Sequence, residues 1–247
     1  MKVKTQKRIS SARKTISYGL RDTYSGICKN LSASWKTIRN GKILRGFLKG
    51  IFQTPLDAFL LLTGKLLSAF QVLFGLETVG RNLTNAEKAI LTKIFAKSLN
   101  YEKIRIKEDK LGFFRLIHAP FTHGDTIYVQ PNWVKNKQQE IQLFVHETVH
   151  IWQHQNRGTN YMSESIFAQT WGILRTGDRG YGYNFMRGIT EGKSFDKLNP
   201  EQQASLIETA FAFNYFENEE ADFEYKNQNL TKYLKTALKI VRKRNTI

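Results

Sequence analysis

The residues best suited to chemistry are two histidines and a glutamate in the run LFVHETVHIWQ, residues 143–153. His146 and His150 are four positions apart, so a helix places both imidazoles on one face, one turn apart. Two neutral imidazoles presented in this way supply two ligands of a tetrahedral zinc site. Glu147 is the expected general base, because zinc lowers the pKa of a bound water to about 7. The pattern predicts a nucleophile that attacks an amide carbonyl at neutral pH.

The residues around this motif predict a helix that is buried along most of its length. Two apolar residues, Phe144 and Val145, precede His146, and two more, Ile151 and Trp152, follow His150. Gly158 is available for a left-handed cap at the end of the helix. The competing interpretation is a core helix whose two histidines are satisfied by ordinary hydrogen bonds, without metal.

A site with two histidines needs a third protein ligand and an open position for water. One class of such sites has a third histidine six residues after His150, but Asn156 stands there. The third ligand is therefore expected to be a carboxylate on a downstream helix. The candidates are Glu201, Glu164, and Glu219 or Glu220 of the acidic run at residues 217–224.

Glu201 ranks first among these carboxylates. Pro200 opens a helix and puts Glu201 in its first turn, and Ala204 is small enough to let this helix approach the histidines closely. Glu164 ranks second and the acidic run last. The alternative roles are a first-turn carboxylate that interacts with the helix dipole, for Glu201 or Glu164, and a solvated face for the acidic run.

The remaining histidines are left out of the metal site, and His118 and His123 are assigned structural roles. His118 and His123 have no ligand partner at local spacing, and His154 continues the ladder but rotates away from a metal held by the first two. A developing oxyanion would also need a hydrogen-bond donor, and three tyrosines are candidates: Tyr161, Tyr181 and Tyr183.

The composition is that of a globular protein with one large domain or two small ones. The 247 residues are 41% hydrophobic and 13% aromatic, which excludes a disordered chain. Cys28 is the single cysteine, so neither an internal disulfide framework nor a cysteine-based zinc site is available.

The net charge of +17 is concentrated near the two ends of the sequence. Residues 1–50 contain thirteen Lys or Arg and one acid, and residues 226–244 contain seven Lys or Arg and no acid. Such a distribution fits an anionic lipid, an acidic partner, nucleic acid or a solvated arm. No specific nucleic acid is expected, because no stacking motif or nucleic-acid fold signature accompanies the charge.

The first 80 residues divide into a basic leader (1–30) and an apolar segment (31–80). The leader is expected to be flexible or to form a basic helix. It lacks the apolar run of a secretory signal peptide. We therefore expect a protein of the bacterial cytoplasm, or one that is exported without a cleavable signal peptide. The longest charge-free window, residues 66–76, is shorter than the roughly 20 residues that span a bilayer. We therefore expect one or two helices, starting after Pro55, that pack on the core. The alternative is an amphipathic segment that binds an anionic membrane.

Residues 81–225 carry the pattern of a domain that contains both helices and strands, and a basic helix is expected to follow over residues 226–247. Thr84 and Glu87 form a capping box for a helix that ends near Leu99. Alternation predicts short strands at residues 104–106, 113–118 and 126–129. The expected fold class is α+β and mostly helical, with a small β-sheet ahead of the HExxH helix.

From Gly80 to about Phe213 the sequence resembles a bacterial group of HExxH zincin-like proteins. This group is related to the core domain of extracellular contractile injection systems and to Vgr/Rhs-associated metallopeptidases. The matching segments are residues 83–87, 101–106, 121–128, 145–153, 158–164, 181–183 and 198–207. The resemblance implies a zincin-like domain of the gluzincin type, with Zn²⁺ on His146 and His150 and with Glu147 as the general base. The Glu-x-x-Ala pattern of gluzincins falls on Glu201.

These observations predict a zinc-dependent metallopeptidase that cleaves a protein or peptide substrate, with Zn²⁺ held by His146, His150 and Glu201. The alternative is a non-catalytic zincin-like subunit, effector or cargo of a contractile injection or type VI secretion system.

Overall fold

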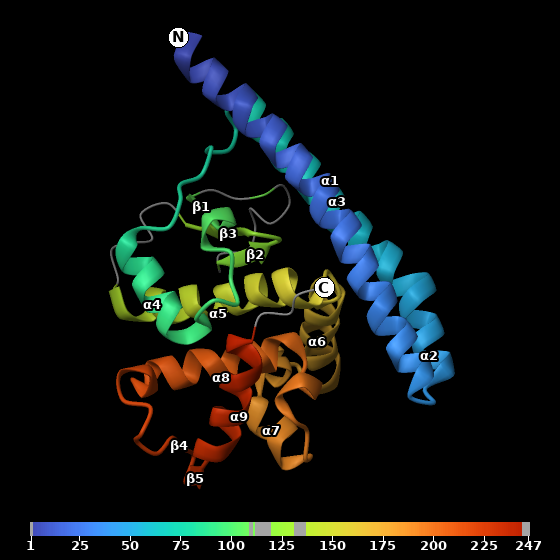
Figure 1. The fold of residues 1–247 in the computed structure, drawn as a ribbon, viewed down its shortest axis with the longest axis vertical. Helices are drawn as coiled ribbons and strands as arrows, with labels where there is room; N and C mark the ends of the chain where they lie inside the picture. Colours follow the sequence, from blue (N-terminus) through green and yellow to red (C-terminus); the bar gives the residue numbers. More distant parts are fainter. Residues whose placement is uncertain (1, 109–110, 112–119, 131–136, 244–247) are drawn as a thin grey trace.

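The computed structural model describes residues 2–108, 111, 120–130 and 137–243 (Figure 1). Its α-helices are α1 (Lys2–Arg39), α2 (Ile43–Leu48), α3 (Thr54–Phe74), α4 (Asn85–Phe95), α5 (Lys137–Arg157), α6 (Tyr161–Thr176), α7 (Phe185–Thr190), α8 (Pro200–Ala212) and α9 (Thr231–Arg242). Shorter turns of helix are η1 (Lys49–Gln53), η2 (Tyr101–Lys103), η5 (Arg179–Tyr183), η6 (Phe195–Lys197) and η7 (Tyr215–Glu217). The strands are β1 (Arg105–Glu108), β2 (Phe121–His123), β3 (Thr126–Val129), β4 (Glu224–Tyr225) and β5 (Gln228–Asn229). The described chain is mostly helical with small sheets, in agreement with the α+β prediction.

The predicted start of α4 is confirmed by its cap. The backbone N–H of Glu87 donates to the Thr84 hydroxyl at 3.2 Å, and the Glu87 carboxylate accepts from the Thr84 N–H at 2.7 Å. The helix ends at Phe95, earlier than the expected Leu99, because Ala96 has a φ of +49° and leaves the helical conformation.

A three-stranded sheet in the order β1-β3-β2 follows α4. β3 pairs with β1 in parallel and with β2 antiparallel. β1 and β3 coincide with two of the expected strands, whereas the strand expected at residues 113–118 lies outside the described residues. Ile106 and Ile127 face each other across β1 and β3, and both are fully buried, so the sheet contributes directly to the core.

Helix α5 runs through the centre of this core, between the sheet and α8 (Figure 1). Its apolar side chains enter both layers, and Trp152 has no exposed surface. Gly158 follows the helix with a φ of +93°, the left-handed conformation expected at its end. The basic C-terminal stretch contributes α9, whose Leu234, Leu238 and Val241 are buried beside α4.

Helices α1 and α3 form a long antiparallel hairpin along one side of the molecule (Figure 1). The basic leader is thus helical. The apolar segment is helical too, but the expectation that its side chains pack into the core is wrong for most of them. The main hydrophobic core starts at Leu83, and the outer side chains of α3, such as Phe59 and Phe70, are exposed. The physical reason is that the inner face of α3 carries polar residues, among them Asp57, Lys65 and Ser68, that form hydrogen bonds with the rest of the protein.

Candidate metal centre

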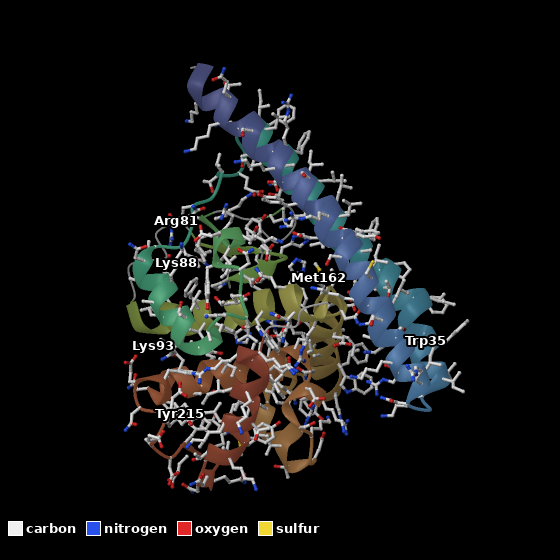
Figure 2. All side chains as sticks on the ribbon, viewed as in Figure 1. Trp35, Arg81, Lys88, Lys93, Met162 and Tyr215 are labelled. Carbon is white, nitrogen blue, oxygen red and sulfur yellow. The ribbon has the colours of Figure 1, made fainter. Side chains whose placement is uncertain are left out.

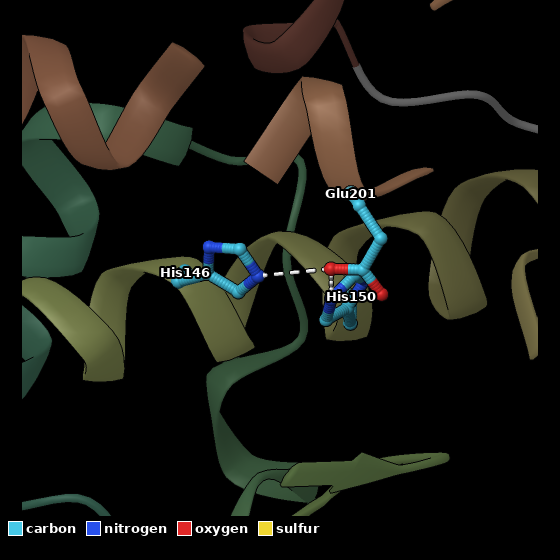
Figure 3. A group of neighbouring side chains, drawn as sticks. All are labelled: His146, His150 and Glu201. Carbon is cyan, nitrogen blue, oxygen red and sulfur yellow. Dashed lines mark hydrogen bonds and ion pairs between the residues drawn. The ribbon is translucent and has the colours of Figure 1, made fainter. Parts of the chain in front are cut away.

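The motif histidines on α5 meet the first turn of α8 (Figure 3). The Nε2 atom of His146 lies 3.2 Å from Oε2 of Glu201, and Nε2 of His150 lies 3.5 Å from the same oxygen. All three residues are buried. Within the described residues, they form a group whose ligand atoms lie within 4.8 Å of one another. The structure therefore brings together the three predicted ligands, and Glu147 follows His146 on the same helix.

Local sequence explains how α8 presents Glu201. The side chain of Asn199 accepts from the N–H of Gln202, and the Gln202 side chain accepts in return from the N–H of Asn199, so a capping box starts the helix. Pro200 occupies the first helical position, and Glu201 follows in the first turn. Ala204 has no exposed surface, which is consistent with the close approach of α8 to α5.

The other carboxylates considered as third ligands lie away from the two histidines. Glu164 on α6 accepts from the Lys49 ammonium at 2.9 Å. Glu219 pairs with Arg242 of α9, and Glu220 is exposed. None of them belongs to the group around His146 and His150.

Hydrogen bonds on the far side of each imidazole fix its orientation. Nδ1 of His146 lies 2.8 Å from Oε2 of Glu208, and Nδ1 of His150 lies 2.8 Å from Oε1 of Gln153. Gln153 donates its amide to the Pro200 carbonyl and to Gln203, so its oxygen must accept from His150. The proton of neutral His150 therefore sits on Nδ1, and the Nε2 lone pair faces Glu201. This is the tautomer that a metal ligand needs.

Sequence reasoning did not identify Glu208, Gln153 or Gln169 as part of the site. Glu208 is seven residues after Glu201, two turns along the same helix, and Gln153 is one turn after His150, so helical spacing contained a signal for both. Gln169 comes from α6 and donates to Oε1 of Glu201 at 2.6 Å, whereas the other carboxylate oxygen, Oε2, faces the two histidines. No local pattern points to that contact.

The electrostatics of the site stabilise positive charge beside its carboxylates. Burial opposes a charge on His146, but hydrogen bonds with Glu201 and Glu208 outweigh it and raise the pKa of His146 to about 10. Burial also opposes ionisation of Glu201, yet the nearby imidazoles hold the pKa of its carboxyl well below the usual value. Protons on the histidines thus balance the buried carboxylates, and a divalent cation can replace them.

Glu147 is positioned differently from the three grouped residues. Burial raises the pKa of its carboxyl, and Oε2 has no hydrogen-bond partner among the described residues. A buried carboxylate oxygen without a partner is costly unless another group approaches it. A water molecule on the neighbouring cation would be such a group.

The three candidate tyrosines lie in different surroundings. The ring of Tyr183, on η5, is centred 5.8 Å from that of His146. The ring of Tyr161 stacks at 5.9 Å on His150, but its hydroxyl accepts from the Gly124 N–H at 3.0 Å. Arg187 covers the Tyr181 ring at 3.7 Å. The rings of Tyr183 and Tyr161 therefore both lie beside the motif histidines.

The remaining histidines lie outside this centre. Burial lowers the pKa of His123 to about 3, and its Nε2 lies 3.2 Å from the Leu60 carbonyl. His154 forms a second group with Asp22 and Asp125. The Lys103 ammonium, 3.5 Å from Asp22, already supplies positive charge to that group. His118 lies outside the described residues.

The set of two imidazole nitrogens and one carboxylate oxygen fits zinc. Zinc accepts both ligand types, and three protein ligands leave a fourth tetrahedral position for water or substrate. Magnesium and calcium prefer an all-oxygen shell, which this centre does not offer.

Comparison with known proteins shows a partial similarity to a secretion-system protein. Over 138 residues the chain is 28% identical to the type VI secretion system spike protein VgrG2b of Pseudomonas aeruginosa. The matched region is 53% of this chain but only 13% of the spike protein, so the chain spans a small part of that relative. No protein-family profile matches the chain, and no solved structure matches it.

Proposed function

We propose that the chain is a zinc-dependent metallopeptidase with a zincin-like domain of the gluzincin type. The observation that carries the proposal is the convergence of His146, His150 and Glu201, with Glu147 adjacent. When bound, zinc supplies a Lewis acid for a peptide carbonyl and lowers the pKa of a coordinated water to about 7.

The side chains around the centre divide the remaining work. Glu147 accepts a proton from the attacking water and passes it to the leaving amine, which requires a carboxylate oxygen without a competing partner, as Oε2 is among the described residues. Glu208 and Gln153 hold the two imidazoles in ligand orientation. Tyr183 donates a hydrogen bond to the developing oxyanion.

Metal analysis combined with cleavage of a broad peptide library tests this proposal. We expect one zinc per chain in the wild type, and loss of zinc in His146→Ala. Glu147→Gln is expected to keep zinc and to lose about 10²-fold or more in cleavage rate, because only the proton transfer is removed. Glu217→Gln, which changes a surface carboxylate paired with Lys93, serves as the matched control. A correctly folded wild-type protein that binds no zinc would refute the proposal.

A second candidate function is a zincin-like effector, cargo or subunit of a type VI or contractile injection system, without catalysis. The partial similarity to a type VI spike protein supports this context. X-ray absorption separates the two candidates: a fourth protein ligand on zinc favours the non-catalytic role, and an exchangeable water favours catalysis. Detection of the chain outside cells with an intact secretion machine, and its loss when the machine is disabled, would support export without a cleavable signal peptide.

A further inference from the structure

Helix α3 has its polar face buried and its apolar face exposed. Five of its eight buried residues are polar: Thr54, Asp57, Lys65, Ser68 and Gln71. The large side chains on the opposite face are all apolar and 38–64% exposed: Leu56, Phe59, Leu66, Leu67, Phe70, Leu73 and Phe74. A helix on the surface of a water-soluble protein shows the reverse arrangement. The outer face of α3 is therefore built for an apolar environment.

The same inversion continues through α1 and α2. Small or polar residues such as Ala12, Gly26 and Ser34 form the inner face of α1. Its outer face carries a row of exposed large side chains, including Leu20, Tyr24, Leu31 and Trp35. Trp35 projects away from the rest of the protein at the end of the hairpin (Figure 2). Both helices of the hairpin thus present apolar surface outward.

The charge around this surface selects an anionic partner. Both acids of residues 4–76, Asp22 and Asp57, are buried, so no carboxylate is exposed on the hairpin there. Its exposed charged side chains are all basic, among them Arg13, Lys14, Arg21, Lys36, Arg39 and Arg45. Apolar side chains flanked by cations are the arrangement that binds at the interface of an anionic bilayer.

The buried contacts of the hairpin favour a helix that lies in the membrane interface. Among the described residues, the helical stretch Ile43–Phe74 is long and apolar enough to cross a bilayer, and only 39% of its most apolar window is buried. However, Asp57 accepts from the Ser163 N–H at 3.0 Å, and the Lys65 ammonium donates to the His123 carbonyl. Crossing would bring these groups into hydrocarbon at a high cost. Binding in the plane leaves them in place.

We propose that the outward face of the α1–α3 hairpin binds the surface of an anionic lipid bilayer, with the apolar side chains in the headgroup region and the lysines and arginines on the phosphates. The proposal is independent of the metal centre, so Glu147→Gln is expected to bind vesicles as the wild type does.

Vesicle flotation with the full chain tests the proposal. We expect binding to phosphatidylcholine vesicles that contain about 30% phosphatidylglycerol, and at least about tenfold weaker binding to phosphatidylcholine alone or in about 1 M NaCl. The double variant Phe59→Glu/Phe70→Glu removes two apolar contacts from α3 and is expected to lower the partition coefficient by about tenfold or more.

A charge-matched control separates the apolar face from net charge. Thr92→Glu on α4 and Thr236→Glu on α9 add the same two charges at exposed positions, on helices that pack together away from the hairpin (Figure 1). This control is expected to retain most of the binding. A second variant, Lys36→Gln/Arg39→Gln, leaves the apolar face intact and is expected to lose about tenfold in binding. Circular dichroism and zinc content verify the fold of each variant.

Three results would overturn the proposal. The first is a wild type that does not float with anionic vesicles at about 0.1 M NaCl. The second is equal binding by the folded Phe59→Glu/Phe70→Glu variant and its control. The third is a wild type that self-associates without binding lipid and becomes monomeric in the double variant, which would assign the face to a second copy of the chain.

Discussion

Removal of the Glu208 carboxylate is expected to weaken zinc binding although Glu208 is not a proposed ligand. Its Oε2 lies 2.8 Å from Nδ1 of His146, and the side chain is 25% exposed. A hydrogen bond to a charged group contributes about 1.5–3 kcal/mol, and partial exposure places this one at the lower end. A loss of about 1.5 kcal/mol corresponds to roughly tenfold in affinity. Loss of such a partner typically costs 10–100-fold.

Competition with a chromophoric chelator measures this effect directly. The expected order of zinc affinity is wild type, then Glu208→Gln, then Glu208→Ala, because the amide keeps an acceptor but loses the charge. Glu217→Ala removes a surface carboxylate outside the site and is expected to match the wild type. Unchanged zinc affinity in a folded Glu208→Ala variant would refute the reasoning that this carboxylate orients His146 as a ligand.

Two further predictions concern pH. Without metal the pKa of His146 is raised to about 10, so zinc must displace a proton at neutral pH. The apparent zinc affinity is therefore expected to rise between pH 6 and 8, about tenfold per pH unit for each displaced proton. Chelator competition measures this dependence, and a flat profile would contradict the reasoning. Burial raises the pKa of Asp57 from 3.8 to about 7, so the folded state holds an extra proton between these pH values. The free energy of unfolding is therefore expected to fall as pH rises through this range, by an amount on the order of 4 kcal/mol. Urea denaturation at a series of pH values measures this fall. Asp57→Asn keeps an acceptor for the Ser163 N–H and is expected to abolish the fall. If the free energy of unfolding of this variant still falls with pH as in the wild type, other groups cause the effect.

The core of the candidate site could be predicted from sequence because its signals are local. The i, i+4 spacing of His146 and His150 fixes their relation on any helix. The Asn199–Pro200 start fixes the first turn of α8, and with it the place of Glu201. What joins the two helices is not local. The pairing of α5 with α8 depends on the packing of side chains more than forty residues apart, and only the structure reveals which of the four candidate carboxylates reaches the histidines.

The orientation of the hairpin shows where local pattern stops being informative. Periodicity shows that α3 has an apolar face and a polar face, but it does not show which of them meets the protein. Burying an apolar face is the usual outcome, because it removes hydrocarbon from water. Here the polar face is buried instead, since each charged group on it finds a partner far along the chain: Ser163 for Asp57 and the His123 carbonyl for Lys65. Those partners lie 106 and 58 residues away, beyond any local pattern. The apolar face left outside therefore has to be explained by an environment that the chain itself does not provide.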